Sequence, residues 1–213
     1  MPVLEMTSEK PIVVVVDDDE DVRASLRELM LSVGLDVSIF SSSRELLDAK
    51  IPDRPGCLVL DIRMPGSSGL DLHQQLLSIG NARPVVFLSG YGDIPMTVQA
   101  MKAGAVDFLT KPFRDQTLLD AVMAGIERDV VNRREARLID ESIERLKTLT
   151  PREREVFQRV ALGRLNKQVA FELGISAITV KLHRSNLMRK MKFNSVGELI
   201  RAWEAMPPER RDR

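Results

Sequence analysis

Residues 57–66 read CLVLDIRMPG, an apolar run that ends at the carboxylate of Asp61 and passes into a turn. A short apolar run closed by a Pro-Gly signal predicts a buried strand. In an open parallel sheet, ligands bind at the carboxyl ends of the strands. We therefore expect Asp61 to lie at the mouth of a strand, held by a rigid scaffold and facing solvent.

Two further apolar runs also end in charged side chains. Residues 12–16 (IVVVV) run directly into the acidic residues 17–19 (DDD), and residues 106–109 (VDFL) run through Thr110 into Lys111-Pro112. If these strands are adjacent and parallel, several carboxylates and one ammonium meet in one small cleft. Crowded carboxylates repel one another unless a cation separates them. Such oxygen ligands suit Mg²⁺, which keeps several waters and leaves room for a phosphate oxygen.

Strand patterns alternate with helical patterns from residue 11 to about residue 128. The strand patterns are residues 12–16, 37–40, 57–60, 84–88 and 106–109. The helical patterns are residues 21–33, a short segment with a Ser42 to Glu45 capping box, residues 70–79 and residues 94–103. Five strands alternating with helices predict an α/β fold, a doubly wound five-stranded parallel sheet covered on both faces.

A long helical pattern begins at Asp115, and it contains neither Gly nor Pro between residues 126 and 149. Apolar residues recur in it at steps of three and four, as in the a/d seam of a coiled coil: Ala136, Ile139, Ile143 and Leu146. The seam covers only about two heptads, fewer than a secure coiled-coil assignment needs. Two interpretations stay open, a coiled-coil dimer or a helix that lies on a domain surface.

An all-α pattern of four helices follows. Thr150 and Glu153 are expected to form a capping box, with Pro151 at the first helical position. Helices are expected over residues 155–162, 167–173, from the Ser176 cap to about residue 190, and after a Ser195 cap with Glu198. The second and third helices are joined by the tight turn at residues 173–176 (LGIS). This arrangement predicts a helix-turn-helix.

The third of these helices has two different faces. Val180, His183, Leu187 and Met191 form the expected core face, on which His183 is a partly buried structural residue. Lys181, Arg184, Ser185 and Met188 lie on the other side, as in a recognition helix in the major groove. Helix starts favour phosphates. The predicted DNA-binding set is Asn166, Lys167, Thr179, Lys181, Leu182, Arg184, Ser185 and Arg189.

Composition narrows the class of protein. No apolar run approaches the roughly 20 residues of a membrane span, and the polar first ten residues do not resemble a signal peptide. The single cysteine, Cys57, falls in a buried strand pattern, which predicts an inert thiol and fits a reducing cytoplasm. Residues 147–213 hold 15 of the 31 basic and 7 of the 31 acidic residues, so this part carries +8 and the rest −8. Such asymmetry indicates an acidic module joined to a nucleic-acid-binding one.

The charged strand ends resemble the CheY-like receiver domain of two-component response regulators. The resemblance implies that Asp61 accepts a phosphoryl group from a sensor histidine kinase, that Lys111 pairs with this group and that Ser89 donates to it. It implies a Mg²⁺ cofactor on Asp17, Asp18, Asp61 and the backbone carbonyl of Arg63. It also implies a cis peptide before Pro112 and a switch pair of Ser89 and Phe108, although Phe108 could simply be core.

Four segments resemble a LuxR-type DNA-binding domain: residues 149–156 (LTPREREV), 166–170 (NKQVA), 173–176 (LGIS) and 179–183 (TVKLH). With the receiver, the chain resembles the NarL/FixJ family. Residues 89–96 (SGYGDIPM) and 100–108 (AMKAGAVDF) are similar to the branch that contains FixJ, StyR and TodT. Phe171 departs from the pattern, because a small or polar residue is expected there. We expect Phe171 to face packing.

These observations predict a flexible N-terminus (residues 1–10), a receiver (11–128), a helical linker (129–147), a helix-turn-helix domain (148–206) and a tail (207–213). The expected function is that of a cytoplasmic response regulator. Phosphorylation of Asp61 would control homodimerisation, through the helix at 94–103 and the strand at 106–109, and sequence-specific binding to promoter DNA. RNA polymerase is a further partner implied by the resemblance.

The chain is not expected to be an enzyme beyond its own phosphoryl transfer and autodephosphorylation, and no membrane partner is expected. Three other interpretations stay open. The acidic cluster also occurs in phosphoaspartate hydrolases. The receiver could be vestigial, with DNA binding independent of phosphorylation. The C-terminal domain could bind protein in place of DNA.

Overall fold

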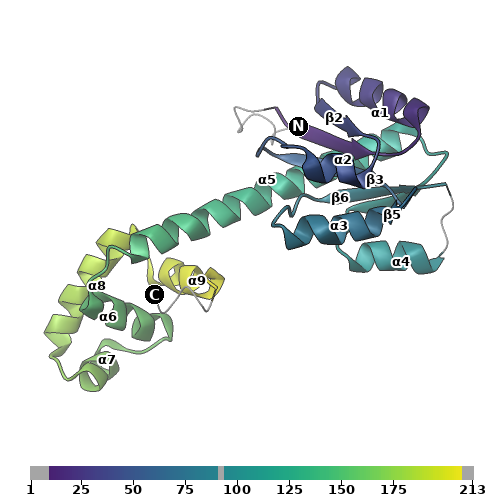
Figure 1. Ribbon diagram of the computed structural model, residues 1–213. Coiled ribbons are helices and arrows are strands. Elements are labelled where there is room, and N and C mark those ends of the chain that lie inside the picture. Colours follow the sequence, from purple (N-terminus) through teal and green to yellow (C-terminus); the bar gives the residue numbers. More distant parts are fainter. Residues whose placement is uncertain (1–9, 91–93, 208–213) are drawn as a thin grey trace. The chain divides into compact units, whose positions relative to one another are not determined.

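A computed structural model describes residues 10–90 and 94–207, and the chain divides into two compact units, Met1–Arg133 and Arg134–Arg213 (Figure 1). The predicted flexible N-terminus and tail lie outside the described residues, except for Lys10 and Pro207, as does the 91–93 part of the SGYGDIPM motif. Within the described ranges, no helix is long and apolar enough to cross a membrane.

The first unit is built on a parallel sheet of five strands: β1 (Ile12–Val16), β2 (Asp36–Phe40), β3 (Gly56–Asp61), β6 (Val85–Ser89) and β7 (Asp107–Thr110). The strand order is β2-β1-β3-β6-β7, which confirms the predicted doubly wound fold. Val16 lies opposite Leu60, so β1 and β3 end side by side and their acidic ends, Asp17 and Asp61, are brought together. Ser89 lies opposite Thr110 at the end of the neighbouring pair, β6 and β7.

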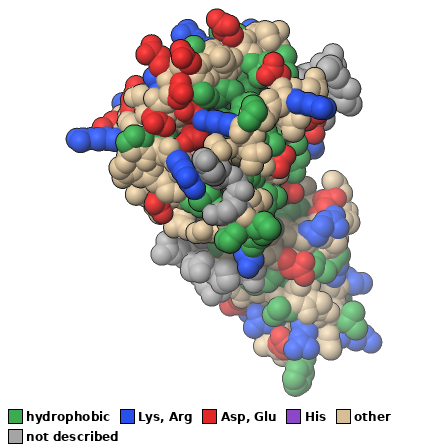
Figure 2. Space-filling model, turned by 90° about the vertical axis from the view of Figure 1, so that its right-hand side faces the viewer, with side chains coloured by type: hydrophobic (Ala, Val, Ile, Leu, Met, Phe, Trp, Pro, Cys, Tyr) green, Lys and Arg blue, Asp and Glu red, His purple; other side chains and the backbone are tan. Residues whose placement is uncertain are grey.

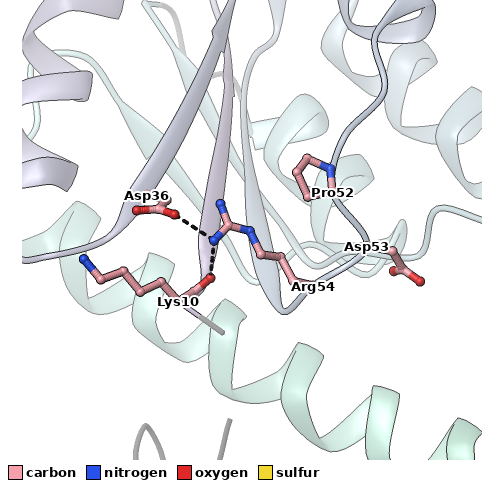
Figure 3. A pocket seen from close by; sticks show the side chains of 5 residues that line it. All are labelled: Lys10, Asp36, Pro52, Asp53 and Arg54. Atoms are coloured by element: carbon pink, nitrogen blue, oxygen red, sulfur yellow. Dashed lines mark hydrogen bonds and ion pairs between the residues drawn. The ribbon is translucent and has the colours of Figure 1, made fainter. Parts of the chain in front are cut away.

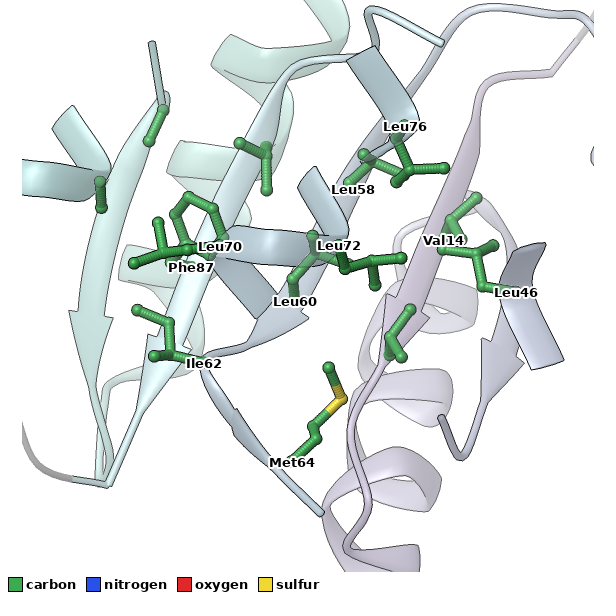
Figure 4. Packing of buried hydrophobic residues seen from close by; sticks show 14 of the residues in the cluster. Val14, Leu46, Leu58, Leu60, Ile62, Met64, Leu70, Leu72, Leu76 and Phe87 are labelled. Carbon is green, nitrogen blue, oxygen red and sulfur yellow. The ribbon is translucent and has the colours of Figure 1, made fainter. Parts of the chain in front are cut away.

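Helices cover both faces of this sheet (Figure 1): α1 (Glu20–Ser32), α2 (Ser43–Asp48), α3 (Gly69–Ser78), α4 (Ile94–Lys102) and the first part of α5 (Asp115–Leu146). The strands are apolar on both faces because each face has its own core. Leu58, Leu60 and Phe87 pack with Leu72 and Leu76 of α3 on one face (Figure 4). The other face packs against α1 and α5.

Helix α5 lies very close to β3. A Cβ atom added to Gly125 of α5 would lie 2.6 Å from the Cys57 sulfur of β3, so only Gly permits this approach. One turn further along α5, the buried Asp129 carboxylate accepts a 2.8 Å hydrogen bond from the Gly56 N–H. The same carboxylate accepts a 2.8 Å bond from Arg133 Nε, and Arg133 also pairs with Asp53. Packing and polar contacts therefore both hold α5 on the strand that ends at Asp61.

A short antiparallel hairpin that the sequence did not predict follows β3. It consists of β4 (Arg63–Met64) and β5 (Ser67–Ser68), and Gly66 in its turn has φ +82°. Gly69 begins α3, and a Cβ atom there would lie 2.2 Å from the Asp61 carbonyl oxygen. The chain therefore folds back sharply on the end of β3.

The second unit contains the end of α5 and four further helices: α6 (Pro151–Ala161), α7 (Asn166–Leu173), α8 (Ala177–Met191) and α9 (Val196–Ala205). The predicted caps Thr150, Ser176 and Ser195 are confirmed, since each side chain accepts the expected backbone N–H. The first helix begins at Pro151 and not at residue 155, because the Thr150 capping box starts it. The core includes the Phe157 and Trp203 rings, which meet edge to face at 5.3 Å.

The structure corrects two expectations about side-chain burial and favours one of the two interpretations of the coiled-coil seam. Phe171 was expected to face packing, but it is 90% exposed, because Val169, Ala170 and Leu173 form the face of α7 that contacts the core. Met188 was expected on the open face of α8, but it packs against the core. In the proposed coiled-coil seam, Ile143 and Leu146 pack into the core of the second unit, which favours the domain-surface interpretation for this part of α5.

Candidate functional site

Three charged side chains meet at the carboxyl ends of β1, β3 and β7. Lys111 Nζ lies 2.6 Å from Asp17 Oδ2 and 2.9 Å from Asp61 Oδ1. Asp17 and Asp61 are 1% and 5% exposed, whereas the Lys111 side chain is 24% exposed. The Lys111-Pro112 peptide is cis, as the resemblance implied, and the Lys111 N–H donates to the Ser89 carbonyl at 2.8 Å. One ammonium group therefore bridges two buried carboxylates and offsets part of their charge.

Burial and charge act in opposite directions on this cluster. Burial raises the pKa of the Asp61 carboxyl, and the hydrogen bond and charge of Lys111 only partly offset that effect. Burial lowers the pKa of the Lys111 ammonium, but the hydrogen bonds to Asp17 and Asp61 outweigh it, so this pKa lies above its ordinary value. Lys111 thus stays charged and holds the Asp61 carboxylate in place.

The remaining Asp61 oxygen points toward the hairpin. Asp61 Oδ2 accepts a 2.9 Å hydrogen bond from the Arg63 N–H. Beside it lies a cavity of about 480 Å³ whose lining includes Asp18, Arg63, Met64 and Met96. Asp18 is exposed there. Among the described residues no group of three or more His, Cys, Asp or Glu side chains is arranged to hold a metal ion, and Lys111 contacts both Asp17 and Asp61.

The predicted switch residues lie next to this cluster on the sheet. Ser89 is fully buried at the end of β6. Phe108 on β7 lies opposite Phe87, is partly buried and packs against the core on the α3 side. Sequence reasoning did not find Met64 and Met96, which line the cavity, because a methionine in an apolar pattern carries no signal for such a position.

The predicted DNA-binding residues fall into two groups. Lys167 and four residues of α8 are exposed: Lys181, Leu182, Ser185 and Arg189. Three others are partly buried and bonded within the unit. Arg184 Nη1 donates to Asn166 Oδ1 at 2.9 Å, and the Thr179 N–H donates to the Ser176 cap. The first group is therefore open to a ligand, whereas Arg184 and Asn166 brace α8 against α7.

Charged side chains of both signs lie on the surface of each unit. In Figure 2 acidic side chains are numerous on the first unit, and Lys and Arg side chains are numerous on the second. Positive charge on a helix-turn-helix unit favours the phosphates of a nucleic acid.

A second cavity, of about 400 Å³, lies at the opposite end of the strands (Figure 3). It is lined by Lys10, Asp36, Pro52, Asp53 and Arg54. Arg54 Nη1 donates to Asp36 Oδ2 at 2.7 Å and to the Lys10 carbonyl at 2.8 Å. Arg54 and Asp36 are thus paired within the protein, and Asp53 pairs with Arg133.

Comparison with known proteins gives one consistent result. Residues 13–123 match the response regulator receiver domain family, and residues 147–203 match the luxR family of bacterial regulatory proteins. Nodulation protein W of Bradyrhizobium diazoefficiens is 52% identical over 93% of this chain and 88% of its own length. The response regulator TodT of Pseudomonas putida is 45% identical over 94% of this chain and 88% of its own length.

Two solved structures are similar to this chain over both of its units. The response regulator StyR covers 92% of this chain and 99% of its own, with 48% identity and a TM-score of 0.73. Full-length FixJ from B. japonicum covers 93% of this chain and 98% of its own, with 37% identity and a TM-score of 0.55. Both similarities span the sheet unit and the helix-turn-helix unit together.

Proposed function

Because this chain belongs to the NarL/FixJ family of response regulators, with a receiver and a LuxR-type DNA-binding domain that regulate transcription, we propose that a sensor histidine kinase switches it by phosphorylating Asp61. The observation that carries the proposal is the Lys111 ammonium, which lies 2.9 Å from Asp61 Oδ1 at the mouth of β3. A carboxylate held beside a fixed cation is suited to accept a group that brings negative charge.

In the proposed transfer, an Asp61 carboxylate oxygen attacks the phosphorus of a phosphohistidine. The new O–P bond forms as the N–P bond breaks, and the imidazole nitrogen leaves with the electron pair and takes a proton from solvent. Lys111 offsets the charge that develops on the phosphoryl oxygens, and the Arg63 N–H keeps the carboxylate oriented. The 480 Å³ cavity is lined by Asp18 and by Ile62 and Arg63, which directly follow Asp61, and the phosphoryl group would approach from this side.

The residues around Asp61 fit Mg²⁺ in their chemistry. Asp17, Asp18 and Asp61 supply carboxylate oxygens and Arg63 a backbone carbonyl, all hard donors of the kind this ion prefers. When bound, Mg²⁺ would polarise the phosphoryl oxygens. We infer that Lys111 then gives up part of its contact with Asp17 and moves toward the phosphoryl group.

The proposed switch passes from Asp61 to the face formed by α4 and β7. Ser89 would hydrogen-bond the phosphoryl group, and Phe108 would turn inward behind it. The changed face would favour a homodimer. Two copies reading two half-sites of promoter DNA gain affinity through effective concentration. The exposed residues proposed to contact DNA are Lys167, Lys181, Leu182, Ser185 and Arg189. The bound dimer would recruit RNA polymerase to the promoter.

The test uses the full chain with a small phosphodonor such as acetyl phosphate and Mg²⁺. The wild type should incorporate phosphate, and Asp61→Asn should incorporate none. Asp48→Asn is the matched control, because Asp48 is exposed and distant in sequence from the cluster. Labelling of Asp61→Asn at the wild-type level would show that the site is wrong.

Dimerisation is tested by sedimentation with Mg²⁺ and beryllofluoride, which mimics the phosphoryl group. A shift from monomer to dimer that is absent in Asp61→Asn supports the switch. A chain that is dimeric without the mimic would contradict dimerisation as its output.

A further inference from the structure

The recognition helix α8 ends in an unusual backbone conformation. Its C-cap, Lys192, has φ 57° and ψ 36°, in the left-handed region. In the described part of the chain it is the one residue other than Gly with a positive φ. Gly34, Gly80, Gly163 and Gly174 occupy such conformations after α1, α3, α6 and α7. A side chain in this region costs roughly 1 kcal/mol or more relative to Gly, so α8 retains a lysine where Gly would be more favourable.

The Lys192 side chain has no ion pair or side-chain hydrogen bond to another described residue, and it is exposed. Its neighbour Lys190 differs, because Lys190 Nζ is bound to Glu153 Oε2 at 2.6 Å. Neither burial nor an ion pair within the protein therefore explains why a charged residue occupies position 192. Strain that is retained at one residue without a structural partner indicates a functional constraint there.

The position of Lys192 along α8 suggests what that constraint is. Lys192 directly follows Met191, the last residue of α8, so its Cα lies at the C-terminal end of the helix. Lys181, Ser185 and Arg189 are exposed along the same helix. A cation at the C-terminal end of a recognition helix lies where the helix leaves the major groove and approaches the flanking phosphates.

We propose that Lys192 binds a backbone phosphate of the DNA, and that this contact maintains a lysine in the left-handed C-cap. The proposal rests on the proposed DNA-binding function. It adds a positioning contact at the C-terminal end of α8 that fixes the depth and register of the helix and reads no base. The simpler alternative is that the lysine only complements the helix dipole, which favours cations at this end.

Two measurements on the full chain separate these explanations. The first is urea unfolding followed by Trp203 fluorescence, because the single tryptophan lies in the core of the second unit. Lys192→Gly should raise the folding equilibrium constant of this unit about fivefold, because the strain is relieved. Lys192→Gln keeps a side chain in the strained conformation and should leave this constant close to the wild-type value.

The second measurement is binding of a fluorescein-labelled duplex of mixed sequence as salt is varied, with Mg²⁺ and beryllofluoride present. Lys192→Gly and Lys192→Gln should both weaken binding about 3- to 10-fold and lower the slope of log K against log salt by about 0.9, the value for one phosphate. Lys192→Arg should bind like the wild type. Lys147→Gln, an exposed lysine paired with Glu144, is the matched control and should change neither quantity.

A variant that is more stable yet binds DNA less well is the result expected from this proposal. If Lys192→Gly and Lys192→Gln bind with the wild-type affinity and salt slope, the phosphate contact is disproved while DNA binding stands. If the wild type shows no salt-dependent binding to the duplex, the proposed DNA-binding function fails, and the role of Lys192 fails with it.

Discussion

Replacing Lys111 with Met should destabilise the first unit near neutral pH and make its stability depend more strongly on the protonation of Asp61. The substitution keeps a side chain of similar length and removes the one cation that contacts both Asp17 and Asp61. Two carboxylates that are 1% and 5% exposed then face each other without compensation. Breaking a fully buried ion pair from one side costs about 3–5 kcal/mol. Because the Lys111 side chain is 24% exposed, we expect a smaller loss, about 2–3 kcal/mol near neutral pH.

The sign of the pH dependence follows from Asp61. Burial already raises the pKa of its carboxyl, and loss of Lys111 removes the main effect that lowers it. A carboxyl whose pKa is higher in the folded than in the unfolded state stabilises the fold at low pH. Lys111→Met should therefore regain stability as pH falls through this raised pKa toward about 3.9, the unfolded value. Added Mg²⁺ should also restore stability, because it supplies the missing positive charge.

The single cysteine provides the assay. Cys57 is fully buried on β3, and burial raises the pKa of its thiol to about 12, so a thiol reagent reacts only when the first unit opens. A loss of 2–3 kcal/mol should speed labelling roughly 30- to 150-fold. Dividing the labelling rate of the variant by that of the wild type at the same pH cancels the pH dependence of the thiol's own reactivity. Lys50→Met, at an exposed loop position, is the control and should label like the wild type.

The reasoning would be refuted by a Lys111→Met variant that labels at the wild-type rate near neutral pH. It would also be refuted if the ratio of the variant's labelling rate to the wild-type rate increased as the pH was lowered. Either result would mean that Lys111 does not hold the two carboxylates together in solution.

Two more predictions use the same labelling rate. Asp129→Ala should destabilise the first unit by about 2–3 kcal/mol, because it leaves the Gly56 N–H without an acceptor. Asp129→Asn keeps an acceptor oxygen and should destabilise the unit less. Equal effects of the two substitutions would contradict this role of Asp129. His73 is 4% exposed, its Nδ1 has no partner among the described residues, and burial lowers its pKa. His73→Leu should therefore match or exceed the wild-type stability near neutral pH, and its advantage should grow as pH falls below about 6.5, the unfolded value; a constant difference would show that His73 protonates freely in the folded protein.

Much of the fold followed from local patterns. The runs Ile12–Val16 of β1 and 57–60 of β3 are apolar at every position because both faces of the sheet are covered, and each run is followed by an aspartate where the strand leaves the core. The caps at Thr150, Ser176 and Ser195 were predictable because a cap needs only a side chain and a backbone N–H three residues away. The left-handed C-cap at Lys192 had no comparable signal, since Gly is the residue that normally marks one.

The sequence by itself determined that Asp17, Asp61 and Lys111 stand at strand ends, because period and turn signals are local properties of the chain. Only the tertiary structure decided how they pair: Lys111 bridges Asp17 and Asp61, whereas Asp18 remains exposed beside the cavity. It also decided that Phe171 is exposed and that Arg184 is bound to Asn166. Burial and pairing depend on neighbours that are distant in sequence, and the register of β1 against β3 and the packing of α7 against α8 bring those neighbours together.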